Sequence, residues 1–354
     1  MRHRGHGRAA FTLVEIMVVI LIITILVGIL IPVVTSVRRR VLFTSIALEV
    51  RNLNDAIESY KNKYKDYPPD FTDSSVVARH IAKAFPRIAP PGIPPLGEPR
   101  PGMGQGWGLD QAEALVFWLG GLSDDPKHPF TGPGGPLKHV GNGQYVANTD
   151  RANAFFEFNQ KRLTYQLLQN GQYASRDELD LHNMADPNPI QQLYTTPDQF
   201  PVYTQKYSDL PFTYHDARSY VVINRGAGTV VYPGYTALGD TTGDVGVARP
   251  YKSTERNPDF NAQTDAPDMA VHFMNRRTFQ IIAPGLDNSY GWDALAPVDS
   301  PAFGQVPCPV FKVFNTGEYF HPSGNAAVPT NYFNSHRDNL TNFSEGRTLE
   351  DSKP

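Results

Sequence analysis

Cysteine is nearly absent from this chain of 354 residues, which has only Cys308. An intrachain disulfide is therefore excluded, so a loop-rich fold needs another kind of stabilisation. Cys308 lies between two prolines in the sequence QVPCPVF, which carries no signature of a nucleophile. A lone cysteine of this kind is expected to be a small buried hydrophobic residue.

A strong charge imbalance is also missing. The net charge is -3, which gives no reason to expect a nucleic-acid partner. Hydrophobic residues make up 40% of the chain, which is enough for a packed core. The 31 prolines and 29 glycines predict long loops and short strands rather than a helical bundle.

The motifs of common enzyme classes are missing as well. The ten histidines are scattered, with no H-E-x-x-H, G-x-S-x-G or Walker pattern. Gly102, Gly104 and Gly106 do not follow a predicted strand, so they do not form a nucleotide-binding loop. His215 and Asp216 are adjacent in a predicted strand, where side chains point to opposite faces and serve packing rather than a catalytic dyad. We therefore expect a protein that is not an enzyme.

What the sequence does contain is one long hydrophobic run near its start. From Phe11 to Val34 the residues are almost all aliphatic, and the part after Glu15 alone has 19 residues. At 1.5 Å per residue, a helix of that length covers about 30 Å, the thickness of the hydrocarbon core of a bilayer. Three arginines, Arg38–Arg40, follow the run. The pattern predicts a membrane-spanning helix over residues 11–37.

Glu15 is the unusual residue of this run. A carboxylate deep in a bilayer costs roughly 2.5–3.5 kcal/mol and generally marks a functional position that has a partner. Three interpretations compete. The first is a cleaved secretory signal, but such a signal has a shorter apolar core with a small-residue cleavage site after it. The second is an ordinary signal anchor, which gives no reason for the acid. The third is processing between Ala10 and Phe11, which keeps the whole helix on the mature protein.

The segment A-FTLVEIMVVILIITILVGILIP resembles the N-terminal signature of type IV pilins and type II secretion pseudopilins. The resemblance implies that residues 1–10 are a leader, that prepilin peptidase cuts between Ala10 and Phe11, and that the new amine of Phe11 is methylated. It also implies that Glu15 meets the amine of a neighbouring subunit, since opposite charges attract strongly in a low dielectric. Pro32 stands where the family commonly has a proline that kinks the helix.

Residues 38–66 continue the helix with a different pattern. Apolar residues recur at intervals of three and four, which forms one stripe of an amphipathic helix: Ile46, Val50, Leu53, Ile57, Tyr60 and Tyr64. This stripe must pack on a globular head. Pro68 and Pro69 end the helix near Asp66. The stretch LNDAIESYKNKYKDYPPD is similar to a segment of major pseudopilins in which the same helix ends in a Tyr-Pro turn.

Residues 67–354 form the predicted head. A Pro- and Gly-rich insertion at 86–106 excludes both helix and central strand. Local patterns predict the other elements: a short helix at 110–122, a strand or helix at 153–166, hairpin-like strands at 210–224 and a strand at 277–285. The expected fold class is α+β, with a long N-terminal helix packed on a small antiparallel sheet that carries long loop insertions, as in pilin-like proteins.

A calcium site is a further expectation from the resemblance. Major pseudopilins bind Ca²⁺ in a loop through carboxylates and carbonyls, and the stretch GLDN, followed much later by DNLTNF, is similar to that loop. The implied ligands are Asp287 and Asp338, with Ser289, Tyr290 and Asn339 contributing carbonyl or side-chain oxygens. From composition alone, the Asp-Asn-Ser run is a plain turn, so this alternative stays open.

The resemblance implies a structural subunit of a pilin-like filament, most like the major pseudopilin of type II secretion. Its partners would be identical and related pilin-like subunits, prepilin peptidase and the inner-membrane assembly platform. It would cross the bacterial inner membrane once, with its head in the periplasm, and assemble into a periplasmic or surface filament. The alternatives are a minor pilin of a type IV pilus, a membrane-anchored binding or enzymatic domain that uses a pilin-type anchor, and a plain signal-anchored domain without a filament.

Overall fold

The structure is a computed structural model that divides into two compact units, Met1–Ser45 and Ile46–Pro354. The residues that it describes are 13–90, 92–94, 109–141, 143–167, 173–175, 200–224, 229–231, 234–236, 247–260, 270–291, 311–314, 319–320 and 337–352. Ala10, Phe11, Cys308 and most of the insertion at 86–106 lie outside the described residues.

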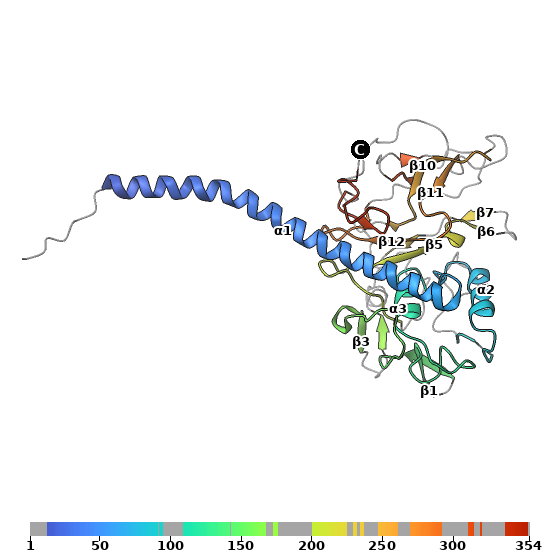
Figure 1. Cartoon of the computed structure of the whole chain (residues 1–354). Coiled ribbons are helices and arrows are strands. Elements are labelled where there is room, and N and C mark those ends of the chain that lie inside the picture. Colours follow the sequence, from blue (N-terminus) through green and yellow to red (C-terminus); the bar gives the residue numbers. More distant parts are fainter. Residues whose placement is uncertain are drawn as a thin grey trace, which may run out of the picture. The chain divides into compact units, whose positions relative to one another are not determined.

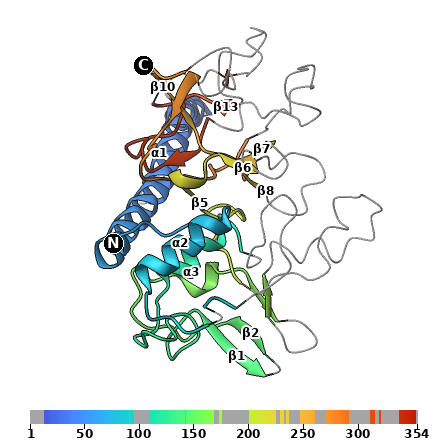
Figure 2. The ribbon, with the colours of Figure 1, turned by 90° about the vertical axis from the view of Figure 1, so that its right-hand side faces the viewer.

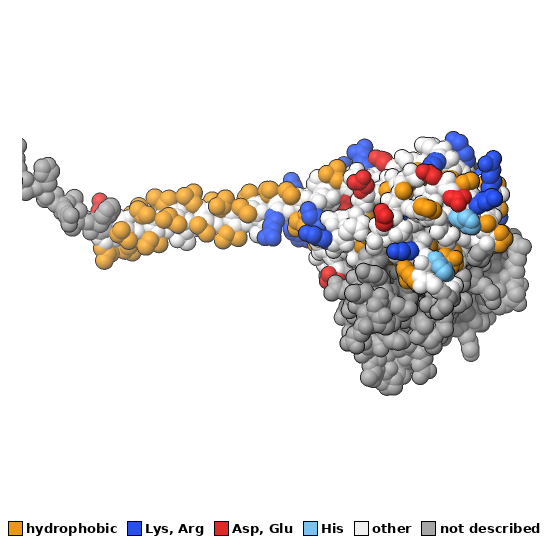
Figure 3. Space-filling view, turned by 90° about the horizontal axis from the view of Figure 1, so that it is seen from below, with side chains coloured by type: hydrophobic (Ala, Val, Ile, Leu, Met, Phe, Trp, Pro, Cys, Tyr) orange, Lys and Arg blue, Asp and Glu red, His pale blue; other side chains and the backbone are white. Residues whose placement is uncertain are grey.

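Helix α1 runs without interruption over 52 residues, from Leu13 to Tyr64 (Figure 1), which confirms the predicted long helix. In the first unit every residue from Leu13 to Val41 is exposed, and Figure 3 shows hydrophobic side chains along the helix. The helix is long and apolar enough to cross a membrane. Its polar side chains bond within the helix: the hydroxyl of Thr24 donates to the carbonyl of Ile20 at 2.8 Å.

In the second unit the same helix is one-sided. The buried residues of α1 are Ile46, Val50, Leu53, Ala56, Ile57 and Tyr60, which confirms the predicted stripe and adds Ala56 to it. The helix ends at Tyr64 because Lys65 adopts a left-handed conformation, with φ of 60°, and the prolines follow. The turn is fixed by buried side chains: Tyr214 donates to the carbonyl of Pro68 at 2.7 Å and Trp118 to that of Pro69 at 2.9 Å.

The central sheet of the head has three antiparallel strands in the order β15-β12-β5, with bounds Leu340–Thr341, Phe279–Ala283 and Thr213–Asp216. All five residues of β12 are buried, which confirms the strand predicted at 277–285. Asn342 joins the sheet to α1, because its side chain accepts a hydrogen bond from the backbone of Ile281 and donates one to Asn54.

The hairpin predicted at 210–224 is wrong. Strand β5 pairs with β12, which is far away in sequence, and β6 (Val222–Asn224) pairs with β7 (Thr229–Val231). A 3-10 turn, η3 (Ala217–Ser219), lies between β5 and β6. The carboxylate of Asp216 starts this turn by accepting a hydrogen bond from the backbone of Arg218, so the chain leaves the sheet instead of folding back on it.

Two short helices belong to the head. Helix α2 (Ser74–Ala84) begins at the N-cap Asp73 and was not expected from the sequence pattern. Helix α3 (Glu113–Leu119) lies within the predicted 110–122, but all seven of its residues are buried rather than one face alone. Asp110 and Glu113 accept hydrogen bonds from each other's backbone N–H groups, which is a capping-box arrangement at its start.

The remaining strands form antiparallel pairs around these elements (Figure 2). They are β1 (Leu137–Gly141) with β2 (Gln144–Ala147), β3 (Tyr165–Leu167) with β4 (Tyr173–Ser175), β8 (Tyr235–Thr236) with β9 (Val247–Ala248), β10 (Lys252–Arg256) with β11 (Val271–Phe273), and β13 (Phe311–Lys312) with β14 (Tyr319–Phe320). The segment 153–166 contains the 3-10 turn η1 (Gln160–Arg162) and the start of β3, so it is mostly irregular rather than one regular element.

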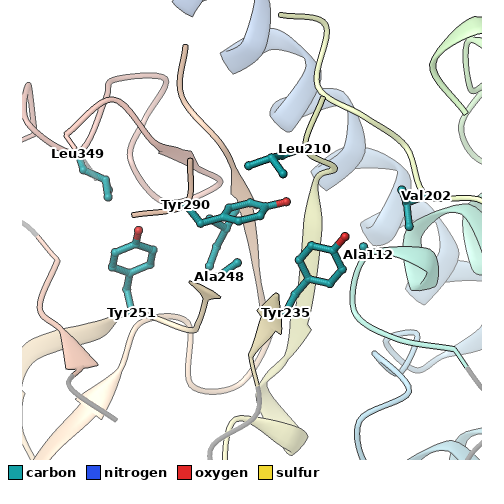
Figure 4. Close-up of a cluster of buried hydrophobic side chains, with 9 residues drawn as sticks. Ala112, Val202, Leu210, Tyr235, Ala248, Tyr251, Tyr290 and Leu349 are labelled. Atoms are coloured by element: carbon teal, nitrogen blue, oxygen red, sulfur yellow. The ribbon is translucent and has the colours of Figure 1, made fainter. Parts of the chain in front are cut away.

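The head is filled largely by aromatic side chains. Around the buried Trp118, five other rings lie within 6 Å, centroid to centroid: Tyr60, Phe71, His80, Phe117 and Phe130. A second cluster gathers Tyr235, Tyr251 and Tyr290 with aliphatic residues (Figure 4). Aromatic pairs of this kind contribute about 0.5–1.5 kcal/mol beyond the burial of their area.

Candidate functional site

The first candidate site is the start of α1, where Glu15 lies in the first turn with an exposed side chain. An acidic residue is favourable there because the N-terminus of a helix carries partial positive charge. Its neighbours are apolar and exposed: Val14 is 66% and Ile16 is 47% accessible. The structure therefore places the carboxylate at the end of a long hydrophobic surface.

That hydrophobic surface surrounds the helix. The large apolar side chains between Leu13 and Val37 are each at least 45% exposed. A continuous apolar patch of this extent marks a surface that a membrane or other protein chains cover. The segment is thus suited to lie in a bilayer or among neighbouring helices.

Pro32 lies inside α1, where it cannot donate a hydrogen bond to the carbonyl one turn earlier, that of Gly28. The hydroxyl of Thr35 donates to the carbonyl of Pro32 at 2.9 Å, and a Cβ added to Gly28 would meet no atom within 4 Å. The helix continues past the proline to Tyr64, so Pro32 weakens the helix locally without ending it.

The second candidate site is the loop after β12, which the structure brings against the segment before β15. The backbone of Leu286 donates to the carboxylate of Asp338 at 2.7 Å. Asp338 lies so close to Gly285 that a Cβ on this glycine would approach its Oδ1 to 1.9 Å. A side chain at position 285 would therefore displace the carboxylate of Asp338.

The carboxyl groups of Asp287 and Asp338 lie close enough to interact. Loss of water around the Asp287 carboxyl, together with the nearby Asp338 carboxylate, raises the pKa of Asp287 to about 7. A pair of carboxyl groups at one place suits a divalent cation, because the cation removes the repulsion.

The three auxiliary residues of the predicted site hold the loop in shape. The side chain of Asn339 donates to the carbonyl of Tyr290 at 3.0 Å and accepts from the backbone of Gly285 at 3.1 Å. The backbone of Ser289 donates to Asp287 at 3.1 Å, and the Ser289 hydroxyl accepts from Gly291. Among the described residues there is no group of three or more His, Cys, Asp or Glu side chains that could hold a metal ion, so a cation here needs carbonyl oxygens as well.

His215 and Asp216, adjacent in β5, are both buried and engage different partners. His215 Nε2 lies 3.2 Å from the hydroxyl of Thr213, whereas Asp216 bonds to Arg218. Burial lowers the pKa of His215 to about 3, so the imidazole is neutral at physiological pH. The arrangement serves packing and the η3 turn.

A partly buried polar network near the end of α1 was not predicted from the sequence. The hydroxyl of Tyr60 lies 2.8 Å from Nε2 of His80, and Nδ1 of His80 lies 2.9 Å from the carboxylate of Asp66. Lys83 and Arg218 also reach Asp66, each at 2.7 Å. Burial alone would raise the pKa of Asp66, but these hydrogen bonds outweigh it and hold the pKa well below its usual range. No local pattern marks a contact between residues so far apart, so the network could not be predicted.

Comparison with known proteins identifies the first site alone. Residues 5–31 match the family model described as the prokaryotic N-terminal methylation motif. No protein of established function and no solved structure matches the chain with significance. The matched segment contains Glu15 and most of the exposed apolar surface of α1.

Proposed function

We propose that this chain is a structural subunit of a pilin-like filament, most like the major pseudopilin of type II secretion. The premise is its N-terminal methylation motif, which indicates a pilin-like protein that is anchored in a membrane and processed by prepilin peptidase. The assignment to the pseudopilins goes one step beyond this premise. It is supported by the resemblance of residues 1–66 to that group.

The observation that carries the proposal is the position of Glu15 within the matched segment. Cleavage between Ala10 and Phe11 creates a cationic amine on Phe11, four residues before the carboxylate. In an apolar setting such charges attract strongly, and the loss of either partner leaves the other uncompensated. A pair formed between two subunits would fix the axial register of one helix against the next.

The two parts of α1 suit such an assembly. The exposed apolar part offers a surface that a bilayer covers before assembly and neighbouring helices cover after it. The part from Ile46 onward packs its stripe within the head, where Glu49 also forms an ion pair with Arg162 and accepts a hydrogen bond from Tyr203 at 2.7 Å. Each subunit would thus carry its head on the same helix that stacks in the filament.

The experiment that tests processing is the mass of the N-terminal peptide of the protein isolated from native envelopes. We expect a peptide that starts at Phe11 and is heavier by one methyl group. An internal peptide from the head, such as one around Trp118, serves as the control for unmodified mass. An intact Met1, or a cut after the apolar run, would contradict the proposal.

A minor pilin of a type IV pilus is the second candidate, and the size of the head favours it. The head spans residues 67–354, which is larger than the head of a typical major pseudopilin. The subunit stoichiometry of isolated filaments distinguishes the two. A major subunit accounts for most of the filament mass, whereas a minor one is present in a small fraction.

We also propose that Asp287 and Asp338 hold Ca²⁺ together with carbonyl oxygens of the same loops. The support is that Asp338 lies against the loop of Asp287, where it accepts a hydrogen bond from Leu286, and that burial and the Asp338 carboxylate raise the pKa of Asp287. The cation would supply charge neutralisation and a cross-link between the loop after β12 and the last strand, β15. In a chain without disulfides, such a link would stabilise the C-terminal part of the head.

A further inference from the structure

Arg38, Arg39 and Arg40 form a basic collar around α1, at the point where its hydrophobic surface ends. All three are exposed, and Figure 3 shows basic side chains gathered there. Consecutive residues of a helix are turned by about 100° from one another, so three arginines in a row point in three directions around the axis. The collar therefore faces its surroundings on most sides of the helix.

The described chain offers the collar no carboxylate partner. The positions three and four residues away on either side hold Val, Thr, Ser, Leu and Phe, and the first acidic residue after the collar is Glu49. Glu49 is already engaged by Arg162. The guanidinium carbon of Arg39 lies 6.0 Å from the centroid of the Phe43 ring.

The position of the collar corresponds to the surface of a bilayer. From Ile16 to Val37 the helix rises about 33 Å at 1.5 Å per residue, slightly more than the hydrocarbon core of about 30 Å. If Glu15 marks one edge of the core, the collar lies at the opposite edge, among the lipid headgroups. Arginine side chains extend readily from this depth to the headgroup level.

We infer that the Arg38–Arg40 collar is a binding site for the phosphate groups of anionic phospholipids in the leaflet on the head side. A guanidinium group donates two hydrogen bonds of well-defined geometry to the oxygens of one phosphate group. The inference requires that α1 spans a membrane, as in the proposed function, but it does not require cleavage or filament assembly. Lipid binding by the collar can therefore fail while filament assembly holds, and filament assembly can fail while lipid binding holds.

The test uses the full-length protein in detergent micelles, with lipid binding measured by native mass spectrometry. Phosphatidylglycerol is titrated against phosphatidylcholine for the wild type and for the variant R38Q/R39Q/R40Q. The variant R87Q/R256Q/R277Q removes the same charge from exposed arginines of the head and is the matched control. The variant R38K/R39K/R40K keeps the charge but loses the paired hydrogen bonds. The circular dichroism of each variant verifies folding.

We expect the wild type to prefer phosphatidylglycerol by on the order of tenfold or more, because each basic residue near an anionic surface adds to binding. The glutamine collar variant should reduce this preference to within about twofold, the lysine variant should keep part of it, and the head control should keep all of it. An absent wild-type preference, or an equal loss in the head control, would overturn the inference. Displacement of the lipid by millimolar inorganic phosphate would also overturn it, because the collar would then bind free phosphate rather than a lipid surface.

Discussion

Helix α1 contains two regions that share one backbone conformation and differ in what surrounds them. From Leu13 to Val41 every residue is exposed, whereas from Ile46 to Tyr60 six residues are buried in the head. The first region is hydrophobic on all sides, and the second has a single apolar stripe. The comparison shows that the distribution of apolar residues around the helix, not the helix itself, decides the kind of partner.

The energetic consequence differs for the two regions. Full burial of a large apolar side chain contributes about 1.5–3 kcal/mol, and the stripe obtains this contribution inside its own head. The apolar region obtains it only from a bilayer or from other subunits. The stripe therefore stabilises the head within a single chain. The first region is covered only when the chain lies in a membrane or in an assembly.

The largest effect is expected for the change E15Q, which breaks the proposed role of the apolar region. If the carboxylate neutralises the Phe11 amine of a neighbour, its loss leaves a buried charge at a cost of about 3–5 kcal/mol. We expect the amount of sedimentable filament to fall by more than tenfold, while carbonate extraction shows normal membrane insertion. D55N, an exposed acid on the same helix, is the control and should assemble normally. Normal assembly of E15Q would contradict the proposed pairing of Glu15 with the Phe11 amine.

The change L53A breaks the stripe of the second region. Leu53 is 0% exposed, so its truncation leaves a cavity and should lower the free energy of unfolding by about 2–5 kcal/mol. Leu48, on the same helix, is 55% exposed, and L48A should change the stability by no more than about 0.5 kcal/mol. Urea unfolding of the full chain in detergent, followed by tryptophan fluorescence, compares the two. Equal effects would show that the stripe is not part of the head core.

Addition of Ca²⁺ tests whether a bound cation stabilises the head, a contribution that the apolar region lacks. At a concentration of one hundred times its dissociation constant, a bound cation stabilises the folded state by about 2.7 kcal/mol. We expect a higher melting temperature in Ca²⁺ than in chelator, with the increase lost in D287N/D338N and kept in the control D259N. If the melting temperature of the wild type does not increase in Ca²⁺, the loop is a plain turn without a bound cation.

The same calcium effect should depend on pH. Asp287 has its pKa raised to about 7, so without a cation the folded state holds this proton between pH 3.8 and 7 and loses stability as the pH rises through 7. Binding of Ca²⁺ requires the deprotonated form. Affinity should therefore increase from pH 6 to pH 8, by at most about tenfold because solvent screens the exposed side chain. Calorimetric titration at the two pH values measures it, and equal affinities would exclude Asp287 as a ligand.

An effect of similar size is expected from His215, which tests the interior of the head. Its folded pKa of about 3 lies below the usual value of 6.5, so only the unfolded chain takes up the proton as the pH falls. The contribution to stability is present above pH 6.5 and decreases toward pH 3, by about 1.5 kcal/mol between pH 6.5 and 5. H215Q should lose stability less steeply over this interval in urea unfolding. An unchanged slope would show that His215 titrates normally.

Much of the helix and part of the sheet could be predicted because their signals are local. The intervals of three and four between Ile46 and Tyr60 define the buried face, and Pro68 limits the helix end. The strand Phe279–Ala283 was visible as a short apolar run. The hairpin at 210–224 was predicted wrongly because the partner of a strand is set by contacts between segments far apart in the sequence, which spacing does not report.

The candidate sites divide in the same way. Glu15 and Pro32 were singled out because they interrupt a uniform run, and the pairing of Asp287 with Asp338 was suggested by a resemblance. The network of Tyr60, His80 and Asp66 has no sequence signal, because it joins α1 to a helix that was not predicted.

The sequence alone determined the extent of α1, the change from a uniformly apolar surface to a stripe, and the position of the arginine collar, because each depends on residues within a few turns of one another. Only the tertiary structure decided that α3 is buried on every side, that β5 pairs with β12, and that Gly285 admits the carboxylate of Asp338. These features depend on which distant segments fill the same space, and close packing selects them from many arrangements that local patterns allow equally.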